Sequence, residues 1–320
     1  MSERIDRALE LLVVWVLLVS GLGLGLALAG HFLAPQVLLA SILLTTGYAW
    51  WTRGAKSSLR GTPNWRHLLF LGLVGLFFRL PAYHYVLGGQ DEGLYVNIAH
   101  HIENTGGVAV SDKVLERLEG TPYAGTYLDE NRSSGLYVPG VYAKSATGTQ
   151  LQFQFYHLFP VWMALFDGIF GNTWAVHALT LFALLSILFF YRLALVVSNS
   201  PRTALLAAPL LAVCPLHAFF SKFPVTEVPT LAFSLIGFTY LAAYRGDVGR
   251  KCSSRWLWIS ALAFGALFVT RISGFMYIPF LAAIALAGAV LDADRQRQRA
   301  VSRWGLAVTG LYALSVWYGL

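Results

Sequence analysis

Apolar runs of the length that a helix needs to cross a lipid bilayer recur along the whole chain, and they constrain its fold more than any other feature. Charged residues make up only 12% of the sequence, against about 25% in a typical soluble domain. The sequence therefore predicts an integral, multi-pass, all-α membrane protein with about nine transmembrane helices. The predicted spans are residues 8–30, 36–51, 68–86, 173–191, 203–220, 228–244, 257–270, 274–291 and 305–320.

The basic residues gather in clusters between these spans. Cytoplasmic loops of membrane proteins have an excess of Lys and Arg, so the clusters predict which ends of the spans face the cytoplasm. They also account for the net charge of +7 without a nucleic-acid partner. The clusters are Arg4 and Arg7; Arg53, Lys56, Arg60 and Arg66; Arg192 and Arg202; Arg245, Arg250, Lys251 and Arg255; and Arg295, Arg297, Arg299 and Arg303.

One further apolar segment, residues 155–170, is interpreted as an interfacial or re-entrant helix. It is short for a span, and it contains His157, Pro160 and Asp167, which are costly at the centre of a bilayer. If it crossed the membrane, every later basic cluster would change sides and the pattern of cytoplasmic basic residues would fail. Because the segment is interpreted as not crossing, residues 81–172 form one large loop on the extracytoplasmic face.

This loop divides the chain into an N-terminal membrane part (residues 1–80), the outer-face loop (residues 81–172) and a helical bundle (residues 173–320). Within the loop, the residue pattern predicts helices at 91–104 and 111–118. Alternating apolar and polar residues at 136–144 and 150–156 predict a β-hairpin. The last span has no polar tail, which is the pattern of a chain that continues beyond residue 320.

Ionisable residues at a membrane boundary are costly to place and are candidates for function. The carboxylates predicted on the outer face are Asp91, Glu92 and Glu227, and the cations are Arg79, Lys222 and Arg271. Structural roles remain open for most of them. Acids stabilise a helix start through the helix dipole, Glu227 can cap a span, and long basic side chains can reach lipid headgroups.

Carboxylates and cations together at a membrane surface suit transfer of a sugar from a lipid-linked phosphosugar. Cations hold the anionic phosphate and stabilise it as it leaves. A carboxylate acts as the general base that takes the proton of the incoming hydroxyl.

The order of these features resembles the GT-C membrane glycosyltransferases, in particular the family-39-like branch of protein O-mannosyltransferases and aminoarabinose lipid A transferases. The similarity covers roughly residues 78–281. It consists of an Asp-Glu pair early in the first outer loop (QDEGLYVNIAHHI), a juxtamembrane segment (residues 156–194), an acid before an apolar helix (SKFPVTEVPTLAF) and a basic residue after a short span (ALFVTRISGFMYIPFL). The chain differs in having two spans, where the family usually has one, before the span that leads into the loop.

The resemblance implies an inverting transfer from a polyprenyl-phosphate sugar to an acceptor hydroxyl on a protein, lipid or glycan. It implies that Asp91 is the base, with Glu92 orienting the base or the acceptor and Glu227 as a second acid. Arg271 is then the contact to the donor phosphate, with Lys222 and Arg79 as further candidates. His157 lies before Phe159-Pro160, where relatives tend to have a basic or His residue.

Two alternatives concern metals, and one concerns function. A divalent cation held by Asp91, Glu92 and Glu227 would resemble the oligosaccharyltransferase branch of the superfamily. His100 and His101 point about 100° apart on a helix, which disfavours joint chelation, so no cofactor is predicted. The functional alternative is a transporter or lipid-binding membrane protein in which residues 155–170 line a pathway.

Overall fold

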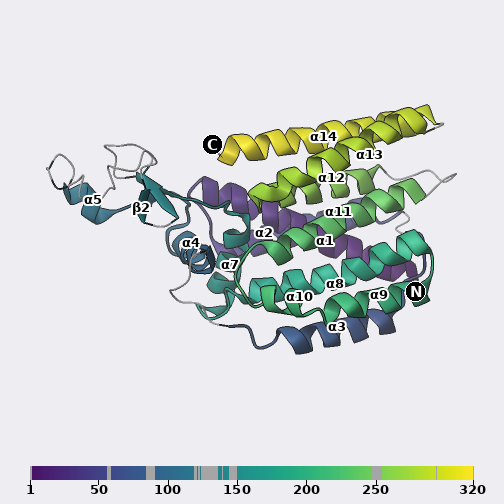
Figure 1. Cartoon of the computed structure of the whole chain (residues 1–320), viewed down its shortest axis with the longest axis horizontal. Coiled ribbons are helices and arrows are strands. Elements are labelled where there is room, and N and C mark those ends of the chain that lie inside the picture. The colour runs from purple at the N-terminus through teal and green to yellow at the C-terminus, as the bar shows by residue number, and fades with distance from the viewer. Residues whose placement is uncertain are drawn as a thin grey trace.

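A computed structural model of the chain describes residues 2–55, 59–83, 91–118, 121, 123, 136–138, 140–143, 150–246, 254–292 and 294–319. Most of the described residues are helical, and the longer helices run side by side along the long axis of the molecule (Figure 1). These helices are α1 (Ser2–Leu28), α2 (Ala34–Trp51), α3 (Trp65–Arg79), α8 (His177–Ser198), α9 (Pro201–Ala212), α11 (Glu227–Gly246), α12 (Arg255–Phe268), α13 (Ile278–Leu291) and α14 (Arg295–Gly319).

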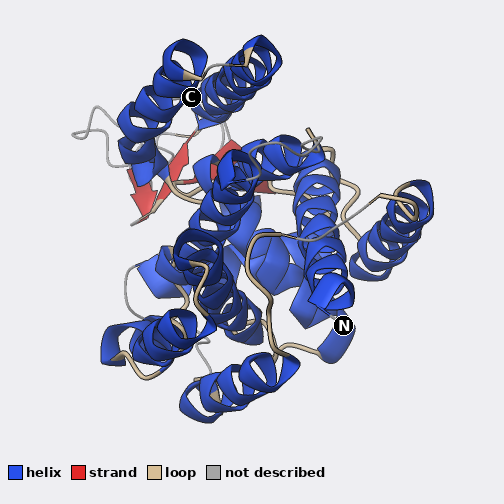
Figure 2. Ribbon diagram, turned by 90° about the vertical axis from the view of Figure 1, so that its right-hand side faces the viewer, coloured by secondary structure: helices blue, strands red, loops and turns tan. Residues whose placement is uncertain are grey.

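The two ends of this bundle differ. The N-terminus, the α8–α9 turn and the adjoining ends of α13 and α14 lie at one end (Figure 1), and Figure 2 looks along the bundle from there. Predicted cytoplasmic arginines that the structure describes lie at this end, among them Arg7 on α1 and Arg202 on α9. The predicted outer-loop elements lie at the opposite end: α4 (Asp91–Thr105), α5 (Lys113–Leu118), α7 (Leu158–Phe170) and the strands.

Three helical segments are long and apolar enough to cross a membrane among the described parts of the chain: Glu3–Leu28, His177–Ser198 and Ile272–Leu291. The last of these joins the 3-10 helix η1 (Ile272–Tyr277) to α13. Helices α2 and α3 are shorter, with 18 and 15 residues, but they expose large apolar side chains, such as Leu43 on α2 and Phe77 on α3. Such side chains suit a lipid surrounding better than water.

The predicted span at residues 203–220 is wrong as a single helix. The structure has α9 there, followed by the short helix α10 (Pro215–Phe220). Pro215 has no backbone N–H to continue the helix, and the residue before a proline is driven out of helical geometry. Cys214 accordingly has an extended backbone, with φ −60° and ψ 122°. The predicted span at 173–191 also lies later than expected, because α8 begins at His177.

The predicted outer-loop helices are confirmed as α4 and α5, and the hairpin is confirmed in part. Strands β3 (Val141–Ala143) and β4 (Gln150–Phe153) pair antiparallel, as predicted. However, the first predicted arm turns back on itself at Gly140 and forms β2 (Leu136–Val138) beside β3. With β1 (Val110–Ser111), the four strands are arranged in the order β1-β4-β3-β2.

Helix α7, predicted as an interfacial or re-entrant segment, is enclosed by other helices. Every side chain from Leu158 to Leu165 is buried, and the helix packs against α4, α2, α1 and α8. Trp162 is fully buried and donates a hydrogen bond to Ser20 of α1. Helix α7 therefore forms the part of the core on which the outer-loop elements rest.

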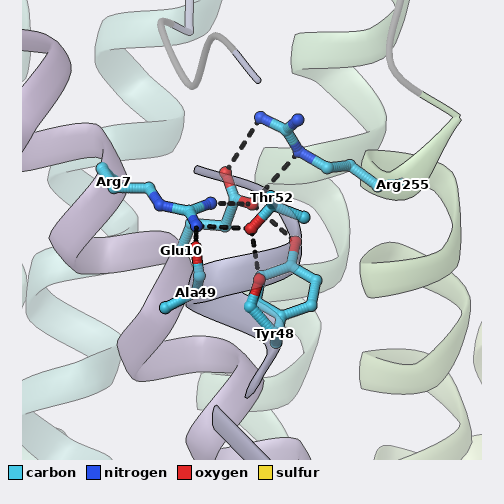
Figure 3. A network of polar contacts seen from close by, with 6 residues as sticks. All are labelled: Arg7, Glu10, Tyr48, Ala49, Thr52 and Arg255. Atoms are coloured by element: carbon cyan, nitrogen blue, oxygen red, sulfur yellow. Dashed lines mark hydrogen bonds and ion pairs between the residues drawn. The ribbon is translucent and has the colours of Figure 1, made fainter. Parts of the chain in front are cut away.

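Some of the predicted cytoplasmic arginines are internal ion-pair partners. Arg192 is fully buried, and its guanidinium donates to both carboxylate oxygens of Asp6, at 2.8 and 3.1 Å. Glu10 pairs with Arg7 and with Arg255, and it accepts a hydrogen bond from Tyr48 (Figure 3). These contacts join α1 to α2, α8 and α12. Basic residues at this end thus stabilise helix packing.

Candidate functional site

A cavity of about 270 Å³ opens at the end of the bundle where α4, α11 and η1 come together. Three residues of the predicted site line it: Asp91, Glu227 and Arg271. They come from three segments that are far apart in the sequence. The other lining residues are Tyr95, Gln154, Phe155, Tyr156, Val225, Thr226, Thr270, Ile272 and Gly319.

Helix α4 contributes Asp91 and Tyr95, which are one helical turn apart and so lie on the same face. Asp91 is exposed, whereas Tyr95 is only 6% exposed. The ring of Tyr95 stacks on Phe155 at 4.6 Å between centroids and meets Phe159 of α7 edge-on. These ring contacts fix the orientation of the first turn of α4, and therefore the position of the Asp91 carboxylate.

The sheet supports the same turn of α4. Gly140 has φ +81°, a backbone conformation that glycine adopts readily and other residues rarely do. A Cβ atom at this position would lie 2.3 Å from Cδ2 of Leu94. Gly140 therefore allows both the tight turn between β2 and β3 and the close approach of that turn to α4.

Arg271 and Glu227 lie next to each other in the wall of the cavity. Glu227 is the first residue of α11, and Arg271 has an extended backbone in the break between α12 and η1. Their side chains form an ion pair, and each is 36% exposed. The Arg271 guanidinium also donates to the hydroxyls of Ser273, at 2.8 Å, and Thr226, at 3.4 Å.

A guanidinium with two neighbouring hydroxyls is a suitable set of donors for a phosphate oxyanion. In the ion pair with Arg271, Glu227 uses one of its two carboxylate oxygens, Oε1. Oε2 of Glu227 is buried and has no hydrogen-bond partner among the described residues. A buried acceptor without a partner is costly, so a donor group of a ligand in the cavity would be stabilised there.

The hydroxyl of Tyr95 lies among these charged groups. Burial raises the pKa of Tyr95 to about 12, and the negative charges of Asp91 and Glu227 act in the same direction. A hydrogen bond with Thr226 and the positive charge of Arg271 oppose this rise only in part. Tyr95 therefore keeps its proton at neutral pH and is available as a hydrogen-bond donor, not as a base.

A second cavity, of about 210 Å³, shares a wall with the first, made by Gln154, Phe155, Tyr156 and Gly319. His157 lines this second cavity and not the first. Its Nδ1 lies within hydrogen-bond distance of the Tyr318 hydroxyl of α14, and Tyr156 stacks on Tyr318 at 5.6 Å between centroids. His157 therefore connects the start of α7 to the end of α14.

Three other predicted site residues do not line the cavity. Glu92 follows Asp91 by about 100° around α4 and so faces another direction. The Lys222 ammonium lies over the ring of Tyr83, 5.4 Å from its centroid. Arg79 is fully buried and donates to the carbonyls of Gly75 and Ala212 and to Nδ1 of His217.

The role of Arg79 follows from the break after α9. Ala212 is the last residue of α9, and a helix end leaves carbonyls without an intrahelical partner. Arg79 supplies a donor to one of them, at 2.8 Å. It therefore stabilises the contact of α3 with the broken helix α9–α10.

The described residues include no group of three or more His, Cys, Asp or Glu side chains placed to hold a metal ion. His100 and His101, considered above as metal ligands, have different partners. Nδ1 of His100 pairs with the buried carboxylate of Asp167 in α7, and Nε2 of His101 lies 2.9 Å from the carbonyl of Ala109.

Comparison with known proteins gives no matching family model, no matching curated protein and no matching solved structure. The arrangement of the site must therefore be interpreted from its own residues. Sequence reasoning missed Tyr95, Thr226 and Ser273. Each had a signal in the sequence, because Tyr95 follows Asp91 by one helical turn and the two hydroxyl residues are near neighbours of Glu227 and Arg271.

Proposed function

We propose that this chain is a membrane glycosyltransferase of the GT-C type, similar to the family-39-like branch. It transfers a sugar from a polyprenyl-phosphate donor to an acceptor hydroxyl, which belongs to a lipid, a glycan or a protein. The observation that supports this proposal most is that Asp91, Glu227 and Arg271 line one cavity. A base and a phosphate-binding cation in the same cavity are the two groups that the reaction requires.

The proposal includes nine membrane spans, with α9 and α10 together as one of them and η1 and α13 together as another. The arrangement of the helices supports this topology, because predicted cytoplasmic clusters on α1, just after α2 and on α9 lie at one end of the bundle, whereas α4 and η1 line the cavity at the other. By the positive-inside rule, the basic end is cytoplasmic. The cavity then opens at the extracytoplasmic face, where a lipid-linked donor in the outer leaflet reaches it.

In the proposed reaction, the acceptor oxygen attacks the anomeric carbon of the donor sugar as the bond from that carbon to the phosphate oxygen breaks. The carboxylate of Asp91 takes the proton of the acceptor hydroxyl. The polyprenyl phosphate leaves with the electron pair of the broken bond, and Arg271 neutralises the charge that develops on it. A single displacement of this kind inverts the configuration at the anomeric carbon.

Glu227 has a positioning role in this proposal. Without a donor, it holds the Arg271 guanidinium at the cavity wall through the ion pair. When the donor phosphate binds, the guanidinium has hydrogen bonds left for it, since it has five N–H donors. Oε2 of Glu227 then accepts a hydrogen bond from a sugar hydroxyl.

Mass spectrometry of the lipids that co-purify with the chain tests the donor class. We expect a polyprenyl phosphate or a polyprenyl-phosphate sugar, retained by the wild-type chain and lost in Arg271→Ala. A membrane transporter, the second candidate, would instead move a solute in vesicles and would retain no polyprenyl lipid. Finding only bulk phospholipid in both proteins would refute the assignment of Arg271.

A further inference from the structure

The basic end of the bundle has a second binding feature, remote from the proposed active site. An open depression of about 510 Å³ lies between the first turns of α1 and the chain just after α2. Its walls include three arginines, Arg4, Arg7 and Arg53, and one acid, Glu3. The depression therefore has an excess of positive charge and favours an anionic ligand.

The lining of the depression also has an apolar part, which includes Ala8 and Leu11. Arg4, Ala8 and Leu11 follow one another at helical spacing and so form a single stripe along α1. Along this stripe, the guanidinium of Arg4 is followed by the methyl group of Ala8 and the isobutyl group of Leu11. A ligand with an anionic head and a hydrocarbon tail matches this change of polarity.

The neighbouring end of α2 marks the level of a membrane interface. Trp50 and Trp51 end this helix and are 66% and 76% exposed. Exposed tryptophans of this kind concentrate at the headgroup level of a bilayer. The guanidinium of Arg53 lies over the ring of Trp50, 5.0 Å from its centroid, so this arginine lies at the same level.

Arg7 is held in place before any ligand binds. Its guanidinium donates to Glu10 and to the carbonyl of Ala49, both at 3.1 Å, and to the hydroxyl of Thr52 (Figure 3). These contacts join α1 to the end of α2 and fix the wall of the depression. Less side-chain freedom is then lost when a ligand binds, which favours affinity.

We propose that this depression binds the phosphate headgroup of an anionic phospholipid of the cytoplasmic leaflet. Arg4 and Arg53 contact the phosphate, Arg7 is the fixed wall, and an acyl chain lies along the stripe of Ala8 and Leu11. The proposal rests on the membrane placement of the helices but not on glycosyl transfer. If the depression does not bind anionic phospholipid, the proposed glycosyl transfer can still be correct. If the proposed transfer is wrong, the depression can still bind the lipid.

The test is native mass spectrometry of the full chain in detergent, titrated with dioleoyl-phosphatidylglycerol or with dioleoyl-phosphatidylcholine as the neutral lipid. Each basic residue near a membrane surface strengthens the binding of anionic lipid by about fivefold. Arg4→Ala/Arg53→Ala is therefore expected to weaken phosphatidylglycerol binding by about thirtyfold. Arg4→Lys/Arg53→Lys keeps both charges and should retain most of the binding.

The matched control is Arg295→Ala/Arg299→Ala, which removes two exposed arginines at the same end of the bundle, on α14. This variant should bind phosphatidylglycerol as the wild type does. Equal weakening in the two alanine variants would mean diffuse attraction and would overturn the proposal, as would unchanged binding in Arg4→Ala/Arg53→Ala. Inorganic phosphate should not compete at millimolar concentration, because the acyl chain contributes to affinity, and effective competition would point to a free anion as the ligand.

Discussion

The guanidinium of Arg271, in the break between α12 and η1, forms an ion pair with the carboxylate of Glu227, the first residue of α11. The pair brings a cation and an acid from separate helices to one cavity wall, opposite the first turn of α4. Each side chain is 36% exposed, so solvent screens the pair and its contribution to folding is small. The pair therefore adds little to stability, and it holds both charged groups at the cavity wall.

Replacing Arg271 with alanine should separate function from stability. We expect the transfer rate to fall by roughly 10²–10³, because a donor of electrostatic stabilisation is lost, with a higher KM for the lipid-phosphate donor. The free energy of unfolding should change by less than about 1 kcal/mol, since the pair is partly exposed and solvent screens it. Lys222→Ala is the control cation, and its activity should stay near that of the wild type because Lys222 lies outside the cavity.

Asp91→Asn tests the general base. The substitution keeps the shape of the side chain and removes its basicity, so the transfer rate should fall by roughly 10²–10⁴ while the chain stays folded. Glu92→Gln should cost much less, because Glu92 does not line the cavity. If Glu92→Gln is the more damaging of the two in an assay of product formation, the base has been assigned to the wrong carboxylate.

Gly140→Ala should weaken the support of the site by the sheet. The new Cβ would meet Leu94, and the positive φ adds strain, at about 1–3 kcal/mol for a non-glycine residue. Gly30→Ala is matched for strain, with φ +75°, but its Cβ would meet nothing within 4 Å. Only Gly140→Ala should also lose transfer activity, and adding Leu94→Ala should restore part of it. Equal activity in the two single variants would show that the contact does not matter.

The buried pair of Asp6 and Arg192 should matter for stability alone. Both side chains are fully buried, and Asp6 also accepts from the backbone N–H of Leu59. Arg192→Met leaves a buried carboxylate without its charge partner, which costs about 3–5 kcal/mol in the free energy of unfolding. Arg202→Met, at an exposed position on α9, should cost little.

Thermal and denaturant unfolding of the purified chain in detergent would measure this difference. Adding Asp6→Asn to Arg192→Met should recover part of the loss, because the uncompensated charge is removed. A double variant less stable than the sum of the single variants would contradict this account of the pair.

Local patterns in the sequence determined much of the structure. The alternation of apolar runs and basic clusters predicted a mainly helical chain with membrane-spanning segments. In the described part of the chain, three helical segments are long and apolar enough to cross a membrane. The pattern after Asp91 predicted α4, since a helical face repeats within a few residues. The number of spans, the reaction and the substrate stay predictions.

Only the tertiary structure decided which charged residues meet. In the sequence, all six charged residues predicted on the outer face were candidates for the site. In the structure, Arg79 is buried against Ala212 and His217, whereas Arg271 lines the cavity. Which face of a helix meets which neighbour depends on the packing of side chains distant in sequence, such as Tyr95 on Phe155. A short motif contains no information about those partners. The helices and the charged residues can therefore be read from local sequence. That Asp91, Glu227 and Arg271 line one cavity depends on how α4, α7, α11 and α12 pack together.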